Sequence, residues 1–123
     1  MNSQKTIALI AHDNLKTSMI EWANAHHTKL STFLVVATGT TGQKLEDQAN
    51  LVVKKYKSGP LGGDQQIGAA IAEGRIDGVI FFWDPLAPHP HDVDVKALLR
   101  IAVVYNIPLA CNEATANLLI QVL

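Results

Sequence analysis

TIALIA, at residues 6–11, is a short and almost uninterrupted apolar run. Similar runs follow at residues 33–38 (FLVVAT), 77–83 (DGVIFFW) and 107–111 (IPLAC). Runs of this length that are apolar on both faces are typical of strands buried in a parallel sheet. A fifth run, LVVKKY at 51–56, alternates poorly and is charged toward its end, which predicts a strand at the edge of the sheet.

Helical spacing of apolar residues fills most of the segments between these runs, and a further helix is expected after TGTTG at 38–42. The spacing predicts helices over residues 14–26, 64–73, 94–105 and about 113–122. Gly74 stands where a glycine commonly terminates a helix. Strands alternating with helices are typical of βαβ units. We therefore predict an α/β fold with a single domain over residues 1–123, a doubly wound three-layer α/β/α sandwich around a five-stranded parallel sheet.

Composition and charge argue against several functional classes. Apolar residues make up 48% of the 123-residue chain, and 10 basic against 11 acidic residues leave a net charge of -1. This balance lacks the positive field that nucleic-acid binding usually needs. The N-terminal MNSQK has no signal-peptide pattern, and no apolar run approaches the roughly 18 residues that cross a bilayer. Cys111 is the only cysteine, which suits a reducing compartment, and we expect it to be a buried strand thiol. The sequence predicts a cytoplasmic protein with no nucleic-acid or membrane partner.

Polar clusters follow four of the predicted strands. They are His12 with Asp13, TGTTG at 38–42, SGPLGGD at 58–64, and the stretch 84–94 that is rich in histidine and aspartate. Because right-handed crossovers place the carboxyl ends of parallel strands at one edge of the sheet, ligands in such folds bind there. The sequence therefore predicts one site assembled from these four segments.

Two of the clusters are rich in glycine and favour an anion. Gly39 and Gly42 allow a close approach of the backbone to a ligand, and threonine hydroxyls beside a helix N-terminus favour negative charge. SGPLGGD repeats this combination before another helix. TGTTG also fits a tight turn in which Thr41 is the helix N-cap, so the motif alone leaves both interpretations open.

Lys16 can supply a cation to this site, because it stands three residues after Asp13 in the first turn of a predicted helix. A lysine there opposes the helix dipole and costs about 0.3–1 kcal/mol unless something compensates, which favours a role in binding. The alternative is a solvated lysine on an exposed helix face.

Carboxylates and histidines at the same edge suggest acid-base chemistry on a phosphorylated carbonyl compound. Asp64 stands at the very start of the helix predicted over residues 64–73, so it is either a catalytic base or an ordinary N-cap. The remaining carboxylates of this edge are Asp13, Asp84, Asp92 and Asp94. In the proline-stiffened segment 88–92, His91 can polarise a carbonyl as neutral imidazole, oriented by Asp92 or Asp94. His12, His89 and His91 lack the spacing of zinc ligands, so we predict no metal.

Several segments together resemble the methylglyoxal synthase family along almost the whole chain. They are IALIAHD with Lys16, ATGTTG, SGPLGGDQQIGA, FFWDPL, PHDVDVKALLR and IPLACNEATA. The resemblance implies a five-stranded parallel sheet and a homo-oligomer, usually a hexamer, with no metal and no organic cofactor. It implies a lyase that converts dihydroxyacetone phosphate to methylglyoxal and inorganic phosphate through an enediolate, with phosphate as an inhibitor.

The resemblance also assigns roles to particular residues. Asp64 corresponds to the family's catalytic base and acid, and His91 to its carbonyl-binding histidine. The positions that match substrate contacts are His12, Lys16, Thr38, Gly39, Thr40, Thr41, Ser58 and Gly59. Asp13 and Asp94 match further active-site carboxylates, and Arg100 matches an arginine tied to subunit contacts and the response to phosphate.

Two alternatives to the lyase stay open. A sugar-phosphate isomerase would use the same base but would release no inorganic phosphate. A non-catalytic regulatory module is the other, because similar domains bind effectors within larger enzymes. The presence of both Asp64 and His91 favours catalysis, since a phosphate binder would need only the glycine-rich segments.

Overall fold

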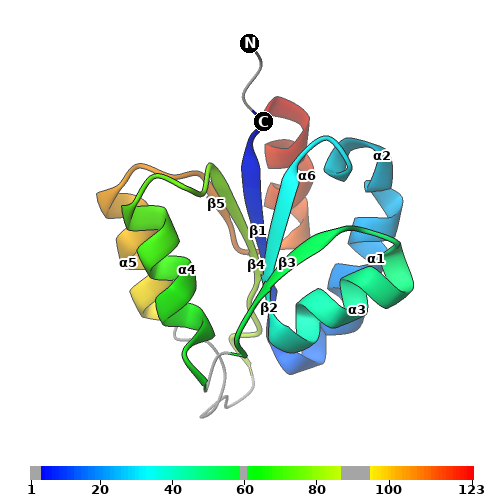
Figure 1. Ribbon diagram of the computed structural model, residues 1–123, viewed down its shortest axis with the longest axis horizontal. Helices are drawn as coiled ribbons and strands as arrows, with labels where there is room; N and C mark the ends of the chain where they lie inside the picture. The colour runs from blue at the N-terminus through cyan, green and yellow to red at the C-terminus, as the bar shows by residue number, and fades with distance from the viewer. Residues whose placement is uncertain (1–3, 59–60, 87–94) are drawn as a thin grey trace.

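The computed structural model describes residues 4–58, 61–86 and 95–123, and its centre is a parallel five-stranded sheet (Figure 1). The strands are β1 (Thr6–Ala11), β2 (Leu34–Thr38), β3 (Val53–Tyr56), β4 (Gly78–Phe82) and β5 (Leu109–Ala110). Their order across the sheet is β3-β2-β1-β4-β5, and every neighbouring pair is parallel. The predicted position of β3 at a sheet edge is confirmed.

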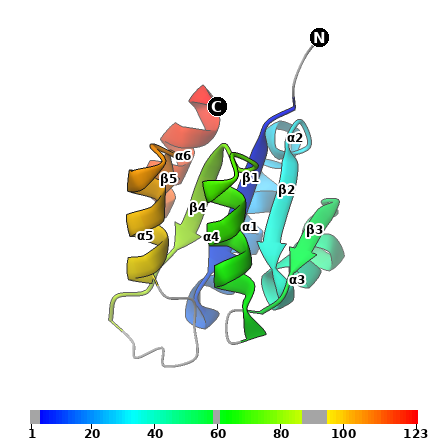
Figure 2. The same cartoon turned by 60° about the vertical axis from the view of Figure 1, so that its left-hand side comes forward.

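Helices cover both faces of the sheet, so the predicted three-layer α/β/α sandwich is confirmed (Figures 1 and 2). The helical elements are η1 (Asp13–Leu15), α1 (Lys16–Ala25), α2 (His27–Leu30), α3 (Gly39–Ala49), α4 (Gly63–Ala72), α5 (Val95–Val104) and α6 (Glu113–Val122). α4 and α5 lie on one face, and α1, α3 and α6 lie on the other. Among the described residues, no helix is long and apolar enough to span a membrane.

The two faces of β1 explain why its sequence is apolar without interruption. Ile7 and Leu9 point into the cluster formed with α1, α3 and α6, whereas Ala8 and Ile10 point into the cluster under α4 and α5. All four side chains are fully buried. Because each face of β1 packs against a different apolar cluster, consecutive residues of the strand must all be apolar.

Several predicted boundaries are wrong, for local reasons. The helix expected over residues 14–26 divides into η1 and α1, because Leu15 has φ -114° and ψ 7°, and α1 ends at Ala25, because His26 has φ -111° and ψ 23°. β5 pairs with β4 at only two positions, so the strand ends before Cys111. Cys111 is half-buried and is not the buried strand thiol that we expected. Gly74 does follow α4, with φ +77°.

Candidate functional site

Segments that follow β2 and β3 meet at the edge where the strand arrowheads end (Figure 2). A Cβ atom on Gly39 would lie 3.1 Å from the backbone nitrogen of Ser58, so the two segments are in contact at this point. The carbonyl of Ser58 in turn accepts hydrogen bonds from the amides of Leu61 (3.0 Å) and Gly63 (2.9 Å). The two glycine-rich segments therefore converge, as their positions after parallel strands predicted.

TGTTG forms the first turn of α3. Thr38 is the N-cap residue, with φ -75° and ψ 155°, and the helix begins at Gly39. The alternative in which Thr41 caps the helix is therefore wrong. The Thr41 side chain is 1% exposed, and its hydroxyl has no hydrogen-bond partner among the described residues. A buried unpaired hydroxyl costs about 1–3 kcal/mol, which a ligand oxygen at the helix N-terminus would offset.

α4 begins at the same edge through two glycines with different constraints. Gly62 is the N-cap in the left-handed region at φ +103°, and a Cβ on Gly63 would lie 1.8 Å from the carbonyl oxygen of Lys57. Asp64 follows inside the first turn, half-buried, with Oδ1 accepting the Gln65 amide at 3.0 Å. The N-cap of α4 is therefore Gly62, and the interpretation of Asp64 as the N-cap is wrong.

His12 lies at the end of the central strand β1 and is 2% exposed. Its backbone amide donates to Phe82 at 3.1 Å, and its Nδ1 accepts the amide of Asp84 at 3.1 Å. The ring meets Phe81 edge to face, with centroids 5.1 Å apart. These contacts fix an imidazole between the carboxyl ends of β1 and β4.

Lys16 begins α1, and its ammonium lies 2.9 Å from Oδ1 of Asp13. The lysine side chain is 18% exposed, whereas that of Asp13 is 72% exposed. Lys16 is thus largely covered and ion-paired, which differs from the solvated lysine of the alternative interpretation. The first turn of this helical segment therefore carries a largely covered cation after β1.

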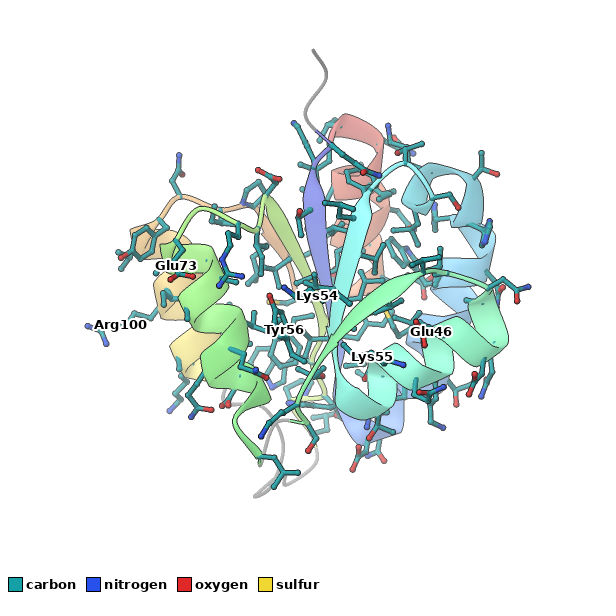
Figure 3. All side chains as sticks on the ribbon, viewed as in Figure 1. Glu46, Lys54, Lys55, Tyr56, Glu73 and Arg100 are labelled. Atoms are coloured by element: carbon teal, nitrogen blue, oxygen red, sulfur yellow. The ribbon has the colours of Figure 1, made fainter. Side chains whose placement is uncertain are left out.

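Three of the predicted site residues, Gly59, His91 and Asp94, lie outside the described residues, as do His89 and Asp92. Arg100 is described, and it projects from the outer side of α5 (Figure 3). No group of three histidine, cysteine or acidic side chains suited to a metal ion occurs in the part of the chain that the structure describes.

A contact between Asn14 and Asp84 was not anticipated from the sequence. Nδ2 of Asn14 donates to Oδ2 of Asp84 at 3.2 Å, which joins the segments after β1 and β4. The residues are 70 positions apart, and neither stands in a motif that suggests the pair. Only the knowledge that β1 and β4 are neighbours could have indicated it.

Two ion pairs away from this edge shift the pKa of one of their members through a hydrogen bond. Lys55 on β3 reaches Glu46 on α3, with Nζ 2.7 Å from Oε1, and this hydrogen bond lowers the pKa of Glu46 (Figure 3). The hydrogen bond from Arg75 to Glu73 raises the pKa of Arg75. Both pairs lie at the surface, so they contribute little to the free energy of unfolding.

The fold and its edge define the class of protein. A doubly wound parallel sheet with the N-termini of α3 and α4, a covered lysine and a buried threonine hydroxyl at its carboxyl edge is an α/β domain suited to an anionic ligand. A family model described as the MGS-like domain matches residues 18–111. The chain belongs to the methylglyoxal synthase family, and it is an enzyme of the lyase class.

Individual relatives support this membership. The methylglyoxal synthase of Pseudoalteromonas atlantica is 61% identical over 95% of this chain and 87% of its own. The methylglyoxal synthase of Clostridium acetobutylicum is 57% identical over 98% of this chain and 83% of its own. The crystal structure of methylglyoxal synthase from Elizabethkingia anophelis superposes with a TM-score of 0.93 at 51% identity, covering 96% of this chain and 78% of that one.

Proposed function

We propose that the chain converts dihydroxyacetone phosphate to methylglyoxal and inorganic phosphate at the edge described above. The observation that carries the proposal is the buried Thr41 hydroxyl in the first turn of α3, the helix whose first residue, Gly39, packs on the backbone of Ser58. An oxygen-rich anion at this point would accept from that hydroxyl and from the free amides of the first helical turn. Lys16 supplies a positive charge nearby, as a phosphate dianion requires.

Asp64 acts as the base in this proposal. It takes a proton from the hydroxymethyl carbon of the substrate, and the electron pair of that C–H bond forms the enediolate with the carbonyl oxygen. The enediolate then expels phosphate from the carbon on the other side of the carbonyl. The resulting enol rearranges to methylglyoxal, and the proton held by Asp64 passes to the leaving phosphate.

The remaining residues bind and orient the substrate. The phosphate lies against residues 38–41, Ser58 and Gly59, with His12 and Lys16 beside it. His91 stabilises the enediolate oxygen, while Asp13 and Asp94 are further carboxylates of the site. Elimination is favoured when the C–O bond to phosphate stands perpendicular to the enediolate plane, so this cradle would separate the lyase from an isomerase.

The distinguishing experiment is an assay with dihydroxyacetone phosphate in which methylglyoxal and inorganic phosphate are measured together. We expect the two products to appear in equal amounts. Glyceraldehyde 3-phosphate without inorganic phosphate would instead identify a sugar-phosphate isomerase. Binding of substrate without either product would identify a regulatory module.

We also propose that the chain assembles as a homohexamer in the cytoplasm. Exposed apolar side chains on and after α5 support an assembly, since Val103 is 80% exposed, Val104 65% and Tyr105 47%. Single exposed apolar residues are ordinary, but three in a row form an apolar patch of the kind that marks an interaction surface. Arg100 on the same helix would then lie near a neighbouring subunit.

A further inference from the structure

We propose that Asn14 and Asp84 together hold His12 in a single neutral tautomer, with its proton on Nε2. Asn14 is thereby a positioning residue that acts through His12. The inference rests on the proposed function only for the role of His12 in substrate binding. The tautomer itself is a property of the free protein.

The tautomer follows from the chemistry of the partner. A backbone N–H can only donate, so the Nδ1 atom of His12 that accepts from Asp84 at 3.1 Å carries a lone pair. In a neutral ring the proton is then on Nε2. A proton on Nδ1 would face the Asp84 amide hydrogen and would lose this hydrogen bond. The ring therefore presents an uncharged donor.

Asp84 is itself held in place at both carboxylate oxygens. Oδ1 accepts the amide of Leu86 at 3.0 Å, which closes a local turn, and Oδ2 accepts from Nδ2 of Asn14 at 3.2 Å. The parallel pairing of Ala11 with Phe82 sets the spacing between the two segments. The position of the Asp84 amide thus depends on a side chain of the segment after β1.

This arrangement divides the binding work between two side chains. Lys16 contributes positive charge, whereas His12 contributes direction, because an N–H on a buried ring can donate to an oxygen only within a narrow range of positions. If Asn14 is lost, the Asp84 carboxylate keeps the Leu86 amide but loses its link to the β1 segment. His12 would then sample both tautomers and donate to the substrate for only part of the time.

The test combines nitrogen NMR with kinetics. In ¹⁵N-labelled wild type, long-range proton–nitrogen correlations, assigned with His12→Asn, should show His12 protonated on Nε2 and bare on Nδ1. Asn14→Ala should give mixed tautomers and raise KM about three- to tenfold with a smaller change in kcat, as expected for one lost orienting hydrogen bond. Asn14→Gln, which retains an amide donor, should restore part of the loss, and Gln48→Ala on the exposed side of α3 should change nothing.

Two results would overturn the inference. One is wild-type His12 protonated on Nδ1, or on both nitrogens, at neutral pH. The other is Asn14→Ala with an unchanged tautomer and an unchanged KM. Failure of the proposed function looks different, because wild type would then show the expected tautomer but release no methylglyoxal.

Discussion

At the scale of single residues, we expect the Thr41 hydroxyl to lower the stability of the free protein and to strengthen the binding of substrate. Its hydroxyl is buried without a partner among the described residues, so Thr41→Val removes a polar group that costs free energy and keeps the shape of the side chain. We expect Thr41→Val to unfold at the same or a higher temperature. We also expect its KM for dihydroxyacetone phosphate to rise about tenfold or more, since a hydrogen bond to a charged group is lost.

Thermal denaturation and steady-state kinetics check this prediction. Thr17→Val, on the exposed side of α1, is the matched control and should alter neither quantity. A Thr41→Val protein with lower thermal stability and normal KM would show that the hydroxyl is structural.

We expect the Cys111 thiol to react slowly with alkylating reagents. Burial raises the pKa of the Cys111 thiol, so at pH 8 a smaller fraction is thiolate than in an unfolded chain. The rate of alkylation by iodoacetamide should therefore be several times lower in the native protein than in denaturant at the same pH. Equal rates in both conditions would contradict the raised pKa.

Residue types at the site could be predicted from the sequence, but their partners could not. Lys16 and Asp13 are three positions apart, and their ion pair follows from helix geometry. The contacts of His12 with Asp84, and of Asp84 with Asn14, depend on which strands are neighbours. The N-cap interpretation of Asp64 is excluded only by the start of α4 at Gly63, which no pattern in the sequence indicates.

At the scale of elements, the start of α4 depends on a glycine that no other residue can replace. A Cβ on Gly63 would lie 1.8 Å from the Lys57 carbonyl oxygen, so Gly63→Ala must displace either the helix or the strand end. We expect the free energy of unfolding to fall by about 1–3 kcal/mol, as in other overpacked sites. The lyase activity should fall as well, because Asp64 moves with the helix.

Gly68→Ala in the same helix is the control. Its Cβ would lie 3.5 Å from Cδ1 of Ile101, an ordinary contact, and alanine favours the helix by up to about 1 kcal/mol. Urea denaturation of the two variants should give changes of opposite sign. If Gly63→Ala left the free energy of unfolding unchanged, the close contact between Gly63 and the Lys57 carbonyl would be contradicted.

Element types followed from the sequence more reliably than element ends. The helix over residues 113–122 begins after Asn112, whose Oδ1 accepts the Thr115 amide at 2.9 Å, a capping signal visible in the sequence. The start of α3 was hidden, because glycine and threonine at 38–42 are typical of turns. Here the packing of Gly39 on Ser58 and of Leu45 in the core overrides local preference.

At the scale of the whole molecule, the fold class was the easiest feature to predict. A chain with apolar strands on both faces and amphipathic helices between them can bury its surface only in a layered sheet. The sequence does not encode assembly as directly, because an exposed apolar helix face becomes recognisable only when the rest of the surface is known.

The exposed face of α5 should hold subunits together. We expect wild type to elute and scatter light as a multiple of the 13.3 kDa chain. Val104→Asp should reduce that mass, whereas Val52→Asp, at a position 91% exposed before β3, should not. A monomeric wild type at assay concentration would contradict both the assembly and the role given to this face.

The most direct test of the central claim is the turnover of Asp64→Asn with dihydroxyacetone phosphate. The control is Asp47→Asn, which removes the same charge from an exposed position of α3. Loss of a catalytic base should lower kcat for both products by about 10²–10⁴-fold while substrate binding, followed by calorimetry, is retained. Asp47→Asn should behave as wild type. If Asp64→Asn releases methylglyoxal and phosphate at nearly the wild-type rate, the base lies elsewhere and the proposed mechanism is wrong.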